Sequence, residues 1–117
     1  MLRLWRATIN SRNGLLFAAR SEQAIREELV ALILAIPLAW LAGATIMRRV
    51  ELFGAVVLVL VVELLNTAIE KLSDRLTTDH DLQIGRVKDM GSAAVGVMLM
   101  MAAAFWLFAI AERIGAI

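Results

Sequence analysis

Five polar residues recur within one stretch of the chain at spacings that would place them on one face of a helix. They are Glu63, Asn66, Thr67, Glu70 and Asp74. At about 100° per residue, all five fall within less than half of the helix circumference. A carboxylate can take a proton from a hydroxyl group or bind a hard cation such as Mg²⁺. This face therefore carries both kinds of group that a protein needs for phosphoryl transfer, a base and metal ligands.

The surroundings of these residues change along the stretch. Glu63 lies within an apolar run, whereas Glu70 and Asp74 precede a charged segment. A carboxylate in hydrocarbon costs about 2.5 kcal/mol or more unless it is paired or hydrated, so Glu63 is a functional candidate. Glu70 would lie about 10 Å further along the helix, nearer to water. We therefore expect a base at Glu63 and a metal ligand at Glu70, with a lipid hydroxyl and a soluble phosphoryl donor meeting between them.

The composition indicates a small all-α membrane protein with a single domain over residues 1–117. Hydrophobic residues make up 61% of the chain, and its mean hydropathy is +0.77. Three apolar stretches are long enough for helices that cross a bilayer, at about 29–47, 52–69 and 90–111. Because the chain has no cysteine and one histidine, we expect no disulfide, thiol nucleophile or His-rich metal site.

An amphipathic helix on the membrane surface is expected over residues 2–20. Leu2, Trp5 and Ile9 recur there at helical spacing beside Arg3. The stretch lacks the continuous apolar region and the cleavage site of a signal peptide, so we expect it to stay in the protein. Its arginines would either anchor the helix to anionic lipid or contact a ligand directly.

Positive charges are distributed unequally around the three predicted spans. Nine of the 12 lysines and arginines precede the first span or lie between the second and third, whereas Arg48, Arg49 and Arg113 lie on the other side. Since positively charged loops stay in the cytoplasm, we expect a cytoplasmic N-terminus and second loop, residues 71–89, and a periplasmic C-terminus. The first loop is expected to be a tight turn at Arg48–Glu51.

Three further charged residues extend the candidate site. Ser21 is a plausible helix start, and Glu22 follows it directly. The Glu22 carboxylate would either interact favourably with the helix dipole or supply an oxygen ligand to a cation. Lys88 would either meet phosphate oxygens as a point charge or snorkel to the membrane interface. Asp89 beside it could orient a partner or bridge to a metal ion.

A polar face of this kind needs more protein around it than three helices of one chain provide. We therefore expect a homo-oligomer with Glu63 and Glu70 at or near a subunit contact. Neither a GxxxxGK[ST] loop nor a kinase Gly-rich loop is present, so a nucleotide site would be of another kind. We expect no nucleic-acid partner.

Two motifs, taken together, resemble a known family. The first is Glu63-x-x-Asn66-Thr67-Ala68-Ile69-Glu70-x-x-x-Asp74, and the second is Gly85-Arg86-x-Lys88-Asp89-Met90-Gly91-Ser92-Ala93-Ala94-Val95. With Glu22 and Glu28 at matching distances upstream, nearly the whole chain resembles the small prokaryotic diacylglycerol kinase family. The resemblance implies a homotrimeric helical bundle in the bacterial inner membrane, with three transmembrane helices and an N-terminal surface helix per protomer and sites shared between protomers.

The resemblance also implies a reaction and its residues. The reaction is ATP-dependent phosphorylation of diacylglycerol to phosphatidic acid in phospholipid recycling, with Mg²⁺ as cofactor and ATP as co-substrate. Glu63 would be the catalytic base and Asn66 its polar neighbour, and Glu22 and Glu70 would bind the metal. The remaining implied positions are Arg3, Asn10, Glu22, Glu70, Lys88 and Asp89 for the nucleotide, Arg3, Glu63 and Ser92 for the lipid substrate, and Glu28 and Asp74 in support.

The N-terminal segment departs from the family pattern. It has no tyrosine, and Asn10 and Arg12 stand where family members carry aromatic residues. Ser92 has a second interpretation, because Ser92 and Gly96 are small residues four apart that favour close packing of membrane helices.

Three alternative functions fit part of the pattern. An undecaprenol kinase of the same family would use the same motif on a polyprenyl alcohol. A small proton-coupled transporter would also carry an intramembrane acid such as Glu63, although a proton path does not require Glu70, Asp74, Lys88 and Asp89. In a non-catalytic assembly factor, Glu63 and Asn66 would only join helices.

Overall fold

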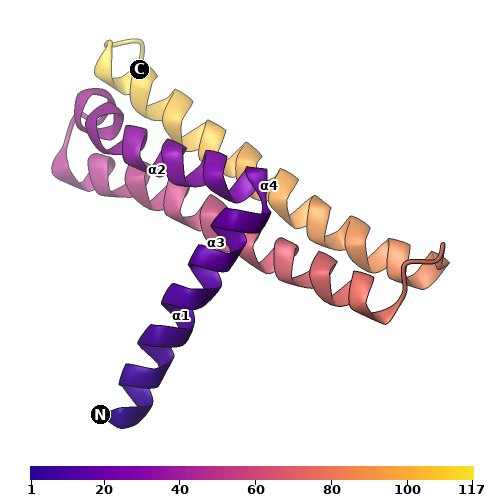
Figure 1. Cartoon of the computed structure of the whole chain (residues 1–117). Helices are drawn as coiled ribbons and strands as arrows, with labels where there is room; N and C mark the ends of the chain where they lie inside the picture. Colours follow the sequence, from indigo (N-terminus) through magenta and orange to yellow (C-terminus); the bar gives the residue numbers. More distant parts are fainter.

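The computed structural model describes all 117 residues and contains four α-helices. Helix α1 spans Leu2–Ser21, α2 spans Gln23–Ala42, α3 spans Ile46–Leu76 and α4 spans Leu82–Arg113. Helices α2, α3 and α4 lie side by side in a bundle, and α1 projects away from it (Figure 1). The predictions of an all-α fold and of a helix at the N-terminus are confirmed.

Helix α3 is the centre of the bundle because it packs against both α2 and α4. Small side chains let the three helices approach one another. Ala39 of α2, Leu52 of α3 and Ala109 of α4 form one buried cluster. A second cluster continues the contact between α3 and α4, and consists of Ala55, Val59 and Ala102.

Helices α3 and α4 are both long and apolar enough to cross a membrane. At 1.5 Å per residue, the 31 residues of α3 extend about 46 Å, which exceeds the hydrocarbon core of about 30 Å. Their polar ends can therefore reach water. Helix α2 does not meet the same criterion, because Arg26, Glu27 and Glu28 charge its first turns. The predicted span 29–47 runs past the end of α2 at Ala42 and into α3, so its bounds were wrong, and a crossing by α2 stays a prediction.

Most of the apolar surface of the single chain is uncovered. Only 15 of the 117 residues are buried, and large apolar side chains such as Leu58, Leu99 and Phe108 are exposed. Exposed apolar surface on this scale marks a membrane or protein contact. Lipid or further copies of the chain must therefore cover these helices.

The first loop is not where the sequence predicted it. Residues 43–45 connect α2 to α3, and the predicted turn Arg48–Glu51 lies inside the first turns of α3. The hydroxyl oxygen of Thr45 accepts a hydrogen bond from the backbone N–H of Arg48 at 3.1 Å, which begins α3. The charged residues of the predicted turn instead form the polar start of α3, outside its apolar span.

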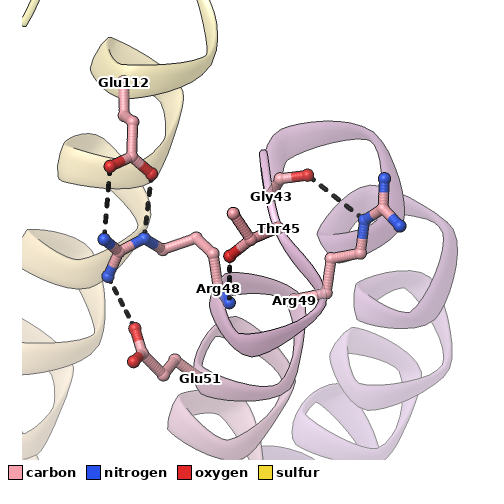
Figure 2. Close-up of polar contacts among 6 residues, drawn as sticks. All are labelled: Gly43, Thr45, Arg48, Arg49, Glu51 and Glu112. Carbon is pink, nitrogen blue, oxygen red and sulfur yellow. Dashed lines mark hydrogen bonds and ion pairs between the residues drawn. The ribbon is translucent and has the colours of Figure 1, made fainter.

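The two arginines near this loop hold the helix ends together. Arg49 Nε donates to the carbonyl oxygen of Gly43 at 3.2 Å, which caps the end of α2. Arg48 Nε pairs with Glu112 of α4 at 3.0 Å, and Arg48 Nη1 pairs with Glu51 at 2.7 Å (Figure 2). The hydrogen bond from Arg48 to Glu112 raises the pKa of Arg48 above its usual value. These pairs join the start of α3 to the end of α4.

The second loop is much shorter than the predicted segment 71–89. Helix α3 continues to Leu76 and α4 begins at Leu82, so only residues 77–81 connect them, and Gly85, which lies within the predicted segment, is part of α4. Asp81 caps the start of α4, because its side chain accepts hydrogen bonds from the backbone N–H groups of Gln83 and Ile84. Charge alone does not separate a loop from the polar end of a helix.

The connection between α1 and α2 also differs from the prediction. Ser21 is the last residue of α1 rather than a helix start, and Glu22 alone, in an extended conformation, separates the two helices. Arg26 Nη1 donates to the carbonyl oxygens of Ala19 and Arg20 at 2.9 and 3.2 Å. Because helix ends leave such carbonyls unpaired, this arginine stabilises the direction change between the helices.

Candidate active site

The polar face of α3 lies between two neighbouring helices. Asn66 is buried toward α4, and Thr67 is buried toward α1. Glu63 and Glu70 are half-buried between them, one turn before and after. Asn66 Nδ2 donates a hydrogen bond to Glu70 Oε1 at 3.3 Å. The amide therefore orients one of the two central carboxylates.

A third carboxylate joins this face from α2. Glu28 lies close enough to Glu63 for their charges to repel each other, and Glu63 repels Glu70 in the same way. A proton or a cation would relieve such repulsion. No group of three Asp, Glu or His side chains has the geometry of a metal site. The three acids therefore do not converge on one point.

Glu22 is brought to α3 by an ion pair. Its Oε1 atom lies 3.0 Å from Lys71 Nζ, and Lys71 Nζ also lies 5.1 Å from the ring centroid of Phe17 in α1. Glu22 therefore reaches the residue directly after Glu70. Two carboxylates from different elements suit Mg²⁺, which commonly takes one or two protein carboxylates and completes its shell with water and phosphate.

A second ion pair joins α4 to α3 near the loop. Lys88 Nζ lies 2.5 Å from Asp74 Oδ1, and both residues are partly exposed to solvent. This contact places a cationic group beyond Glu70, at the end of the face that can reach water. A lysine there can neutralise phosphate oxygens.

Four predicted site residues are not brought to this face within one chain. Asp89 and Ser92 are exposed. Each comes directly after a residue that faces α3, so its own side chain is rotated by about 100° away from α3. Arg3 and Asn10 are exposed on the projecting helix α1 (Figure 1).

A groove between α1 and α3 lies beside the carboxylates. It has a volume of about 520 Å³, and its lining includes Leu64, Thr67 and Lys71 from α3. Small residues of α1, Gly14 and Ala18, open the space on the other side. The groove was not predicted from the sequence, in which small residues recurring on one face of residues 2–20 are the available signal. The groove is apolar along most of its wall and polar at its Lys71 end.

Comparison with known proteins identifies the family. A family model described as prokaryotic diacylglycerol kinase matches residues 9–110. The chain belongs to this family. It is therefore a lipid kinase, and the resemblance predicted from the motifs is confirmed. A kinase of this family implies ATP as co-substrate, and the family together with two long apolar helices indicates a membrane protein.

Individual relatives support the same assignment. The diacylglycerol kinase of Escherichia coli (strain K12) is 38% identical over 113 residues, which cover 97% of this chain and 93% of the relative. The diacylglycerol kinase of Haemophilus influenzae is 36% identical and covers 86% of this chain and 85% of its own length. That of Pseudomonas aeruginosa is also 36% identical, over 89% and 85%. These matches cover most of this lipid kinase and most of each relative.

Proposed function

We propose that this lipid kinase transfers the γ-phosphoryl group of MgATP to the free hydroxyl of diacylglycerol, giving phosphatidic acid and ADP in phospholipid recycling. The observation that carries the proposal is the hydrogen bond from Asn66 to Glu70 on a face that also carries Glu63. One acid on this face is oriented by an amide and the other is left without a hydrogen-bond partner. That difference suits a fixed metal ligand and a free base.

The roles follow the order of the residues along α3. Glu63 takes the proton of the lipid hydroxyl while the hydroxyl oxygen attacks the γ-phosphorus. The bond between that phosphorus and the bridging oxygen breaks, and ADP leaves with that oxygen. Glu70 and Glu22 would hold Mg²⁺, which would supply positive charge to the phosphate oxygens. Lys88 adds a second positive charge at the end of the face nearest water.

The groove between α1 and α3 suits the lipid substrate. It is apolar enough for an acyl chain and opens beside Thr67, one turn from both carboxylates. A diacylglycerol lying there would present its hydroxyl toward Glu63. Undecaprenol, the alternative substrate, would need the same groove to hold an isoprenoid chain.

We further propose a homotrimer with shared active sites. Four predicted site residues are exposed in the single chain, namely Asp89, Ser92, Arg3 and Asn10, so a neighbouring protomer would have to supply them. Mixing Glu63→Gln with Asp89→Asn protomers tests this. Each variant alone should be inactive, and mixed oligomers should regain activity, because some sites then contain both native residues. Cross-linking that finds only monomers in an active preparation would contradict the proposal.

The proposed location is the bacterial inner membrane. Three crossings, by α2, α3 and α4, would place the N-terminus and residues 77–81 in the cytoplasm and the C-terminus in the periplasm. This orientation follows from the excess of positive charge around α1 and residues 71–89. It would put Glu70, Asp74 and Lys88 on the side that holds ATP.

The reaction is tested by following labelled γ-phosphate from ATP into extracted lipid. Purified protein is assayed with diacylglycerol and with undecaprenol in the same lipid micelles, with Mg²⁺ and after its removal by a chelator. We expect rapid labelling of diacylglycerol, and loss of nearly all transfer when Mg²⁺ is removed. Faster labelling of the prenol would assign the enzyme to undecaprenol, and labelling of neither lipid would contradict both substrate assignments.

A further inference from the structure

Gly91 of α4 packs directly against the side chain of Asn66 in α3. Gly91 is buried, and a Cβ atom at this position would overlap Asn66 Oδ1 and lie 3.3 Å from Asn66 Cγ. The next neighbour, Ile69 Cδ1, would lie at 3.9 Å, an ordinary van der Waals distance. The Asn66 amide is therefore the one group that excludes a side chain from position 91.

The orientation of the Asn66 amide follows from its two neighbours. Nδ2 donates to Glu70 Oε1 at 3.3 Å. An ionised carboxylate only accepts hydrogen bonds, so the amide oxygen cannot take the place of Nδ2. Oδ1 must then point toward α4, where it is buried and has no hydrogen-bond donor. It occupies the space that a Cβ atom on Gly91 would need.

We propose that Gly91 is a positioning residue for the metal-binding carboxylate. The missing side chain at position 91 leaves room for Oδ1 of Asn66, which keeps Nδ2 on Glu70 and so fixes the direction of the Glu70 oxygens. Gly91 touches no substrate and acts only through Asn66. This inference rests on the proposed function, because it takes Glu70 to be a metal ligand.

The substitution Gly91→Ala tests the proposal, with Gly96→Ala as its matched control. Both glycines lie inside α4, but a Cβ on Gly96 would meet nothing within 4 Å. Alanine favours a helix at either position, so within the chain the overlap with Asn66 is what distinguishes the two variants. Substituting a group that orients a metal ligand typically lowers metal affinity or activity about 10- to 100-fold.

The readout is Mn²⁺ binding as well as turnover. Mn²⁺ affinity is measured by electron paramagnetic resonance on the folded oligomer with a non-hydrolysable ATP analogue. We expect Gly91→Ala to weaken Mn²⁺ binding and to raise the Mg²⁺ concentration for half-maximal activity, each about tenfold, with KM for diacylglycerol within about twofold. Gly96→Ala should change neither. A purely structural role for Gly91 would lower the yield of folded protein without moving the metal dependence.

A double substitution makes the test independent of how well Gly91→Ala folds. In an Asn66→Ala background the overlap is gone, so adding Gly91→Ala should be tolerated and should leave Mn²⁺ affinity within about twofold of Asn66→Ala alone. Equal losses with and without Asn66, failure of the double variant to fold, or native Mn²⁺ affinity in Gly91→Ala would each overturn the inference.

Glu70→Gln, measured in parallel, separates this inference from the proposed function. If Glu70→Gln keeps native Mn²⁺ affinity, the metal role of Glu70 is wrong and the inference falls with it. If Glu70→Gln weakens binding while Gly91→Ala does not, only the role of Gly91 is wrong.

Discussion

Replacing Glu63 with glutamine should lower kcat by about 10²- to 10⁴-fold, the range that a general base contributes. Glutamine keeps the shape of the side chain but cannot take the proton of the lipid hydroxyl. The fold should be retained, because Glu63 makes no ion pair and its charge is repelled by Glu28 and Glu70. KM for diacylglycerol should change little, since the groove between α1 and α3 is untouched. The measurement is transfer of labelled γ-phosphate at saturating MgATP.

Glu27→Gln is the matched control for this variant. Glu27 lies beside Glu28 but is exposed, and it only accepts a hydrogen bond from Gln23. Its substitution removes the same charge nearby and should leave kcat within about twofold, the range usual for a surface change. Full activity in Glu63→Gln would contradict the role of Glu63 as the catalytic base.

Replacing Glu70 with glutamine should lower kcat/KM for MgATP by at least about 100-fold, comparable to the loss of one electrostatic stabiliser in other enzymes. The amide of Asn66 can still donate to the side-chain oxygen of glutamine, so the packing between α3 and α4 should persist. What is lost is the negative charge that would hold Mg²⁺. The expected signature is a higher Mg²⁺ requirement, whereas Glu63→Gln should lower kcat at every Mg²⁺ concentration.

Glu51→Gln serves as the control for Glu70→Gln. Glu51 lies on the same helix at its far end, where it pairs with Arg48. Because the ion pair between Arg48 and Glu112 remains, this substitution should alter neither the Mg²⁺ dependence nor kcat/KM. An unchanged Mg²⁺ requirement in Glu70→Gln would contradict the metal role.

The spacing of residues along the chain determined much of this protein. The interval of seven between Glu63 and Glu70 placed both on one helix face whatever the rest of the chain did, because helical periodicity is local. Apolar length likewise predicted the crossing segments in α3 and α4, and the combined motif identified the family. Helix ends were not predicted, because charged residues such as Arg48 and small residues such as Gly85 occur both in loops and in the parts of helices that project beyond the membrane.

Tertiary structure decided which residues meet across helices. The ion pairs of Glu22 with Lys71 and of Asp74 with Lys88 join residues on different elements, and no periodicity within one helix encodes them. The contact of Gly91 with Asn66 depends on the rotation of α4 about its own axis relative to α3. That rotation is set by packing between the two helices, including the contacts of Leu52 with Ala109 and of Ala55 with Ala102, and so it became visible only once the helices were placed together.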